Sequence, residues 1–162
     1  MRRILISFVA TFAVALPVFV LAARDGAPPQ RTESLGALPP APKPDASTDQ
    51  RVAALQATVR AAPKRADGWT LLAGAYLQKV RETGDAGFYA RAEGAVDRAL
   101  RLRPDDAGAL TQRSALELSR HDFKAGLRDA LRARALAPAV IAPFGTVVDA
   151  LVELGRYPQA ER

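Results

Sequence analysis

Apolar and polar positions divide the chain into three stretches. Residues 4–23, ILISFVATFAVALPVFVLAA, carry no charged side chain, and residues 24–48 are rich in proline and polar side chains. From residue 49 onwards, apolar side chains recur at the spacings of three, four and seven that mark an amphipathic helix. The alternation that marks a β-strand does not occur there. The pattern predicts an all-α domain over residues 49–162, preceded by one apolar helix and a linker.

The segment of residues 4–23 leaves two interpretations open. As a helix it would span about 30 Å, the thickness of a hydrocarbon core, and its twenty uncharged residues exceed the roughly 7 to 15 of a typical signal core. Both points favour an uncleaved membrane anchor. The alternative is a cleaved secretory signal, because Arg2 and Arg3 precede the segment and Ala22 and Ala23 offer a cleavage site. Either way, the positive N-terminus predicts that the helical domain of residues 49–162 faces the extracytoplasmic side. It would be anchored there or released into the periplasm or medium.

Residues 24–48 have the composition of a spacer. Prolines, glycine, alanine and polar side chains dominate the stretch, with the prolines gathered in two clusters. Such a sequence has no core to join and predicts a flexible, semi-extended linker that holds the folded part away from the membrane.

The rest of the chain repeats itself. Three prolines that end predicted helices each precede a large apolar residue by six positions: Pro63 and Trp69, Pro104 and Leu110, Pro138 and Phe144. The stretch before the second proline also matches the stretch before the third, with Tyr89, Ala92, Val96 and Ala99 in the slots of Phe123, Gly126, Ala130 and Ala133. A period of 34 residues separates Pro104 from Pro138. Self-similarity of this kind predicts stacked helix-turn-helix units.

These slots resemble those of the tetratricopeptide repeat (TPR) family, whose unit has the same 34-residue length. The first helix of that family carries Trp, Leu, Gly or Ala, and Tyr in order, and here Trp69, Leu72, Ala73 and Tyr76 stand in those places. The resemblance implies a right-handed superhelix, an α-solenoid, over residues 49–162. Its expected parts are a lid helix at 49–62 with Asp49 as its N-cap, repeats at 66–104 and 107–138, and a partial repeat at 141–162.

The units depart from the family pattern in three places. The first unit runs 41 residues, and its seven extra residues fall around Val80 to Gly87, which makes that longer loop a candidate contact site. In the second unit Arg113 and Glu117 replace Leu and Tyr, and their spacing predicts a local ion pair along one helix face. In the third unit the sequence given ends five residues after Tyr157. We expect either a longer array or a partner that covers the face of residues 141–154.

The resemblance also implies a binding site, namely a concave groove lined by the first helix of each pair, which takes an extended peptide or a partner's helix. The groove-facing slots fall on Asp67, Thr70, Gly74, Gln78, Thr111, Ala115, Ser119, Gly145, Asp149 and Glu153. These side chains are small or polar and lack the lysine and asparagine cluster with which some family members grip an acidic C-terminus.

Charge adds an alternative partner. The net charge of +6 would suit nucleic acid or anionic lipid, and many arginines fall on two predicted second helices. Acidic residues such as Asp97 and Asp129 interrupt them, and no aromatic residues interleave to stack bases, so a solvated helix face is favoured over nucleic-acid binding.

The sequence contains none of the common catalytic motifs. It has no cysteine, its one histidine, His121, falls at a predicted turn, and Asp105 with Asp106 sits where carboxylates cap the following helix. We therefore expect no enzyme activity, cofactor or metal. The function predicted from sequence is a membrane-tethered scaffold that binds a protein partner. The alternatives are a structural module that self-associates through the third repeat and an anionic-surface binder that uses the arginine-rich helices.

Overall fold

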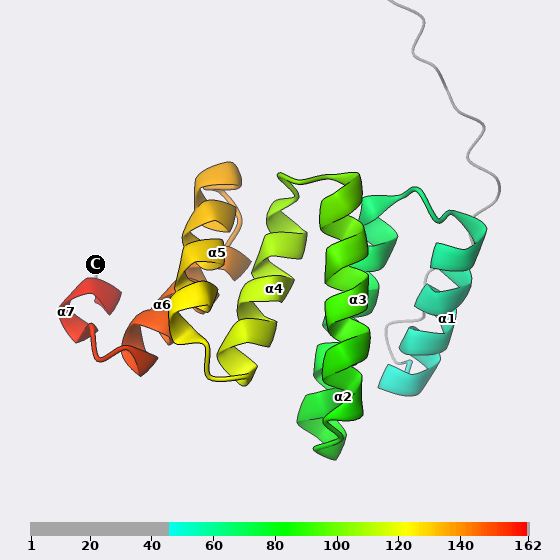
Figure 1. The fold of residues 1–162 in the computed structure, drawn as a ribbon, viewed down its shortest axis with the longest axis horizontal. Helices are drawn as coiled ribbons and strands as arrows, with labels where there is room; N and C mark the ends of the chain where they lie inside the picture. Colours follow the sequence, from blue (N-terminus) through cyan, green and yellow to red (C-terminus); the bar gives the residue numbers. More distant parts are fainter. Residues whose placement is uncertain (1–45, 162) are drawn as a thin grey trace, which may run out of the picture. The chain divides into compact units, whose positions relative to one another are not determined.

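The computed structural model describes residues 46–161. The predicted anchor at 1–23 and nearly all of the linker at 24–48 lie outside the described residues. Within them the chain is all-helical and forms seven helices (Figure 1): α1 (Thr48–Ala61), α2 (Ala66–Thr83), α3 (Gly87–Leu102), α4 (Ala107–Ser119), α5 (Phe123–Leu136), α6 (Ala142–Glu153) and α7 (Tyr157–Ala160). No helix in this part of the chain is long and apolar enough to cross a membrane.

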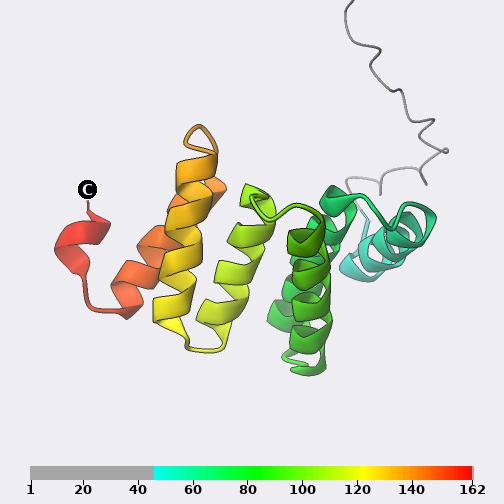
Figure 2. The ribbon, with the colours of Figure 1, turned by 45° about the horizontal axis from the view of Figure 1, so that its top comes forward.

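The helices pack in sequential antiparallel pairs. α2 packs on α3 and α4 packs on α5, while α3 contacts α4 and α5 contacts α6 and so join one pair to the next. The first helices of the pairs also contact each other, α2 with α4 and α4 with α6, and the pairs stay side by side when the view is tilted (Figure 2). This arrangement is consistent with a helical repeat array.

Small residues let the paired helices approach closely. Ala92 and Ala99 of α3 and Ala130 and Ala133 of α5 have no exposed surface, and they are the small slots of the repeated pattern. A Cβ atom on Gly126 would lie only 2.9 Å from Cδ2 of Leu118, so a side chain on α5 would collide with α4 at this point. The predicted meeting of small and large faces is therefore what holds each pair together.

The apolar interior forms two clusters. One runs through α1, α2, α3 and α4 and includes Leu55, Tyr76 and Val96. The other lies between α5 and α6 and is centred on Leu127 and Leu151. Each cluster is built from neighbouring elements, as expected of a stack in which a unit contacts only those next to it.

Local signals set where the helices begin and end. Asp106 caps α4 by accepting from the backbone N–H of Ala109 at 2.9 Å, and Asp122 caps α5 in the same way. The cap expected at Asp49 is wrong: α1 begins earlier, and Ser47 is its N-cap. Ser47 and Gln50 form a reciprocal capping box, which satisfies two backbone N–H groups and so outcompetes a cap from Asp49.

The seven extra residues of the first unit are helical. α2 has 18 residues against 13 in α4, and α3 has 16 against 14 in α5, whereas both pairs are joined by three residues. The longer pair turns at Gly84, whose positive φ of 69° suits glycine. Phe88 covers the added length, with its ring 6.0 Å from that of Tyr76.

Candidate functional site

Two neighbouring hollows lie along the first helices of the pairs. The first has a volume of about 710 Å³ and lies between α1, α2 and α4. The second, of about 350 Å³, lies between α4, α5 and α6. Arg81, near the end of the long helix α2, lines both. We call the two hollows together the groove.

Seven of the ten sequence-predicted site residues line the groove. Thr70, Gly74 and Gln78 of α2 line the first hollow. The second hollow is lined by Ala115 and Ser119 of α4 and by Asp149 and Glu153 of α6. Helices from three different pairs thus contribute to the two hollows.

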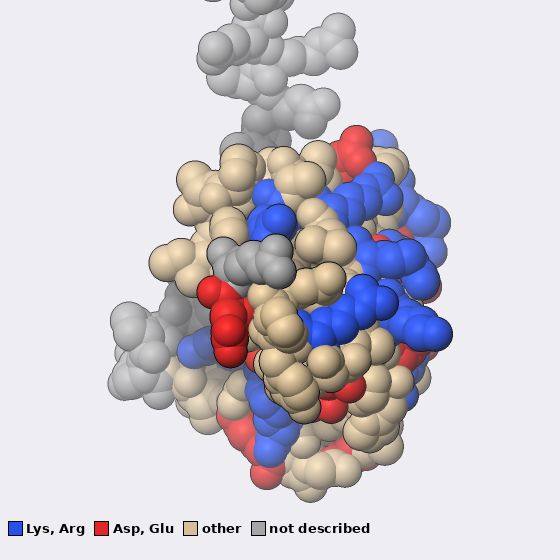
Figure 3. All heavy atoms as spheres, turned by 90° about the vertical axis from the view of Figure 1, so that its left-hand side faces the viewer, with Lys and Arg blue, Asp and Glu red and all other residues tan. Residues whose placement is uncertain are grey.

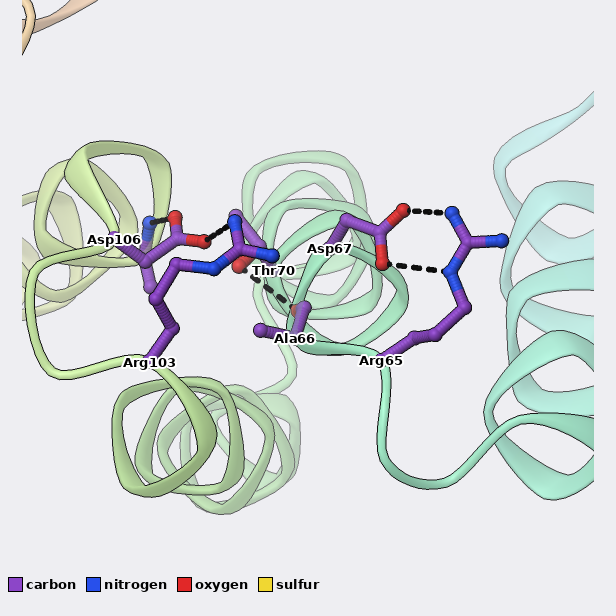
Figure 4. Close-up of polar contacts among 7 residues, drawn as sticks. Arg65, Ala66, Asp67, Thr70, Arg103 and Asp106 are labelled. Atoms are coloured by element: carbon purple, nitrogen blue, oxygen red, sulfur yellow. Dashed lines mark hydrogen bonds and ion pairs between the residues drawn. The ribbon is translucent and has the colours of Figure 1, made fainter. Parts of the chain in front are cut away.

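The other three predicted residues do not line the groove. Thr111 is buried, and its hydroxyl donates to the carbonyl oxygen of Ala107 at 2.7 Å. Gly145 is exposed on α6 and lines neither hollow. Asp67 forms an ion pair with Arg65 at the start of α2 (Figure 4), and this hydrogen-bonded guanidinium lowers the pKa of the Asp67 carboxyl.

Figure 4 shows that the start of α4 carries a matching pair. Arg103 donates to Asp106 at 2.8 Å, and Asp106 also caps the helix. Thr70 is drawn between the two pairs, and its hydroxyl donates to the carbonyl oxygen of Ala66 at 3.2 Å. Asp106 therefore holds the start of α4 in place, whereas Asp67 pairs with Arg65 beside the start of α2 and keeps a half-exposed side chain.

The first hollow is mainly apolar at its floor and polar at its rim. Leu55 and Ala75 are buried, and Leu71 is 60% exposed within it. Gln78 and Glu82 form the rim: the Gln78 amide donates to Glu82 at 2.8 Å, and the Thr48 hydroxyl donates to the same carboxylate at 2.7 Å. These hydrogen bonds lower the pKa of Glu82, so the rim holds a fixed negative charge at neutral pH.

The sequence interpretation missed several groove residues. Arg51 lies on the helix taken only as a lid, and Gln112 follows a predicted slot by one position. Arg81 lies three residues after Gln78, so extending the predicted stripe by one helical step would have found it. Leu71 is adjacent to the predicted slot Thr70, but its apolar side chain gave no signal of a binding role.

The ion pair predicted between Arg113 and Glu117 is wrong. Arg113 instead reaches across to Asp129 of α5 and donates two hydrogen bonds to its carboxylate, from Nε to Oδ2 and from Nη2 to Oδ1 at 2.9 Å, while Oε2 of Glu117 is buried without a hydrogen-bond partner. Burial raises the pKa of Glu117 to about 7, and the negative charge of Asp129 adds to this effect while Arg113 opposes it. Asp122 and Arg128 of α5 also face this carboxyl, with opposite effects.

Two arginines of the second helices make equivalent contacts inside the fold. Arg98 of α3 donates to the carbonyl oxygen of Pro63 at 3.4 Å, and Arg132 of α5 donates to that of Pro104 at 3.3 Å. Each proline ends the preceding second helix. These side chains therefore join successive units, in addition to any contact they make with solvent.

The outer face of α6 is apolar and exposed. Ile141, the N-cap of α6, is 85% exposed, and Phe144, Val148 and Val152 of the helix are each about two-fifths exposed. In Figure 3, which looks at this end of the molecule, uncharged side chains occupy the centre and basic ones gather along the right-hand side. The face expected at residues 141–154 is thus uncovered in the described structure.

The remaining candidates are dispersed. The longer loop expected at Val80 to Gly87 is not found, because only residues 84–86 connect α2 and α3, although residues 81–87 are exposed. His121 lies in the turn between α4 and α5 with a φ of 63° and lines the second hollow. Among residues 46–161, no three acidic or histidine side chains come close enough together to hold a metal ion.

The comparisons with known proteins leave the domain without a family assignment. No protein-family model matches the sequence, and no curated protein is significantly similar to it. The chain carries an all-helical domain of packed antiparallel helices.

Proposed function

We propose that the chain is a non-enzymatic protein-interaction scaffold of the tetratricopeptide type, tethered to a membrane by residues 4–23 and facing its extracytoplasmic side. Its partner is a peptide or helix held in the groove. The observation that carries the proposal is the groove itself, to which α2, α4 and α6 contribute in turn. Its residues are small or polar at the centre, which leaves room for a partner's backbone and offers it hydrogen bonds.

Two glycines provide a matched test. Gly74 lies in the first hollow, and a Cβ atom there would be 3.3 Å from the Gln112 side chain, so a leucine would fill the space. Gly94 lies exposed on α3, where a Cβ atom would meet nothing within 4 Å. Gly74→Leu and Gly94→Leu make the same chemical change in a helix, inside and outside the groove.

The experiment is photo-crosslinking in membranes with the full-length chain. A benzophenone amino acid replaces Leu71 in the groove or Arg101, exposed on α3, as the control position. We expect a specific adduct from position 71 alone, lost in the Gly74→Leu background and kept in the Gly94→Leu background. Equal labelling from both positions, or an adduct that survives Gly74→Leu, would place the partner elsewhere.

The exposed face of α6 favours a second candidate, self-association. Three apolar side chains on α6 and that of its N-cap, Ile141, form a patch of the kind that marks interaction sites. Under this candidate the mass of the full-length chain in detergent rises with protein concentration, and Val148→Glu abolishes the rise. A mass independent of concentration would rule it out.

A further inference from the structure

Charged side chains are unevenly distributed along the groove. The first hollow holds Arg51 and Arg81 with one acidic residue, Glu82. The second holds Asp149 and Glu153 with one basic residue, Arg81, which lines both hollows. The lining of the first hollow is therefore net positive and that of the second is net negative, with Arg81 shared between them.

The charges at the two ends are available to a ligand. Within the described residues Arg51, Asp149 and Glu153 make no ion pair with another side chain, and all three are exposed. Glu82, by contrast, is already hydrogen-bonded by Thr48 and Gln78. The unpaired charges thus define the polarity of the site.

Apart from Arg81 at the junction of the two hollows, the middle of the groove is uncharged. Leu71 stands 60% exposed beside the buried Leu55, which makes an apolar surface next to the basic end. Gly74 and Ala115 add no bulky side chain to the middle of the groove, and the uncharged Gln112 side chain lies beside Gly74. A ligand's main chain can therefore lie close to α2 and α4 while its side chains reach the two ends.

We infer that the groove selects a peptide with opposite charges at its two ends: a carboxylate over Arg51 and Arg81 with an apolar side chain against Leu71, and a basic side chain against Asp149 and Glu153. This inference rests on the proposed function and adds the chemistry of the partner to it. It excludes polyanions as ligands, because phosphates attracted to Arg51 would be repelled by the carboxylates of α6.

The fold sets the spacing of the two charges. Packed helices lie about 8 to 10 Å apart, so α2 and α6, each in contact with α4, are separated by roughly 16 to 20 Å. An extended chain advances about 3.3 Å per residue. The acidic and basic side chains of the ligand are therefore expected about five or six residues apart, in either chain direction.

The test begins with a random dodecapeptide library displayed on phage and selected on the full-length chain in detergent micelles. We expect enriched sequences to carry Asp or Glu about five or six positions from Lys or Arg, with an aliphatic residue beside the acidic one. The most enriched sequence is then synthesised with a fluorescent label, together with a diacidic and a dibasic version of the same peptide.

Protein variants with like charges at both ends make the prediction specific. Asp149→Lys with Glu153→Lys leaves both ends basic, and Arg51→Glu with Arg81→Glu leaves both ends acidic. By fluorescence anisotropy, the unsubstituted protein binds the mixed-charge peptide at least tenfold more tightly than the other two. The basic variant prefers the diacidic peptide and the acidic variant the dibasic one.

The outcomes separate this inference from the proposed function. If enriched peptides lack the charge pattern but lose binding in Gly74→Leu and keep it in Gly94→Leu, the groove binds peptides and the inference about charge is wrong. If no peptide is enriched, or Gly74→Leu changes nothing, the proposed function fails and the inference fails with it. Tighter binding of a labelled single-stranded oligonucleotide than of any peptide would also overturn the inference.

Discussion

At the scale of single residues, close packing leaves little tolerance where the paired helices cross. Gly126 of α5 lies against Leu118, whose Cγ and Cδ2 atoms would be 3.0 and 2.9 Å from an added Cβ atom, and against the carbonyl oxygen of Ser114. Contacts this short require the Leu118 side chain or the backbone at Ser114 to shift. The helix pair therefore depends on the absence of a side chain at this position.

We expect Gly126→Ala to destabilise the protein by about 1 to 3 kcal/mol, although alanine favours helix more than glycine does. Gly94→Ala is the matched control, because nothing lies within 4 Å of that position. There the helix propensity acts alone and adds about 0.5 to 1 kcal/mol of stability. Urea denaturation of the full-length chain measures both effects, and a stabilising Gly126→Ala would refute the close approach.

The buried carboxyl of Glu117 predicts a pH-dependent stability. Its pKa is about 7 in the folded protein against 4.5 for an ordinary glutamate, so between these values the folded chain binds a proton that the unfolded chain loses. Raising the pH through this window therefore lowers the free energy of unfolding. Glu117→Gln removes the titration. At pH 8 the free energy of unfolding of this variant should exceed that of the unsubstituted protein by about 1 to 2 kcal/mol after allowance for solvent screening, and at pH 4 the two free energies should agree.

A second glutamate gives the control of opposite sign. Arg120 donates to Glu93 and lowers the pKa of its carboxyl, so this ion pair stabilises the fold above the ordinary glutamate pKa and is lost as the pH falls through the lowered value. Glu93→Gln should therefore reduce stability at pH 8 and have no effect at strongly acidic pH. If the stability of the two variants relative to the unsubstituted protein changed with pH in the same direction, the raised pKa assigned to Glu117 would be contradicted.

At the scale of the elements, the start of α1 depends on a capping box. Ser47→Ala removes the side-chain oxygen that accepts from the Gln50 N–H, and we expect a loss of about 1 kcal/mol. Asp49→Ala removes only an ion pair between Lys79 and a carboxylate that is 79% exposed, and should cost under about 1 kcal/mol. Thermal denaturation of the full-length chain compares them, and a larger loss for Asp49→Ala would restore that residue as the cap.

The helices and their order could be predicted because the signals are local. Prolines at 63, 104 and 138 each follow a helix end, and the small residues of α3 and α5 are buried as their spacing indicates. Ser47 and Asp49 are both good caps two positions apart, so choosing between them required the Gln50 partner. The Arg113 ion pair was mispredicted because its true partner, Asp129, lies on another helix and pattern reasoning considered only the spacing along one.

The groove was foreseeable only in part for the same reason. Slots on α2, α4 and α6 follow helical spacing, and seven of them line the hollows. The residues that α1 contributes to the groove depend on the packing angle between α1 and α2, which no local pattern specifies. Thr111 has the right spacing, yet it is turned into the interface and buried.

At the scale of the whole described domain, stability should be graded along the array. Each helix contacts only helices of its own pair and of the adjacent pair, and α6 with the short α7 is packed from one side by α5 and α4. We expect hydrogen exchange of the full-length chain to be slowest in α3 and α4 and fastest in α6 and α7. Val147→Ala, in the cluster between α5 and α6, should speed exchange in α6 while protection of α2 and α3 is unchanged.

The outcome that would contradict this view is a uniform loss of protection. If Val147→Ala sped exchange equally in all helices, the domain would unfold as one cooperative unit. The two separate apolar clusters argue for the graded response.

The lengthened α2–α3 pair carries a consequence for how such a chain can change over time. Its seven additional residues amount to about two helical turns, shared as five in α2 and two in α3, and the connection between the helices keeps its three residues. The added length lies at the tip of the hairpin, after Leu77, the last buried residue of α2, and before Ala92, the first buried residue of α3, so the buried side chains keep their neighbours. Two residues inserted in the middle of α2 would instead rotate everything after them by roughly 200°. The tip of this hairpin is therefore the place where descendants of the sequence can gain or lose length, extending or shortening one wall of the groove without rebuilding its floor.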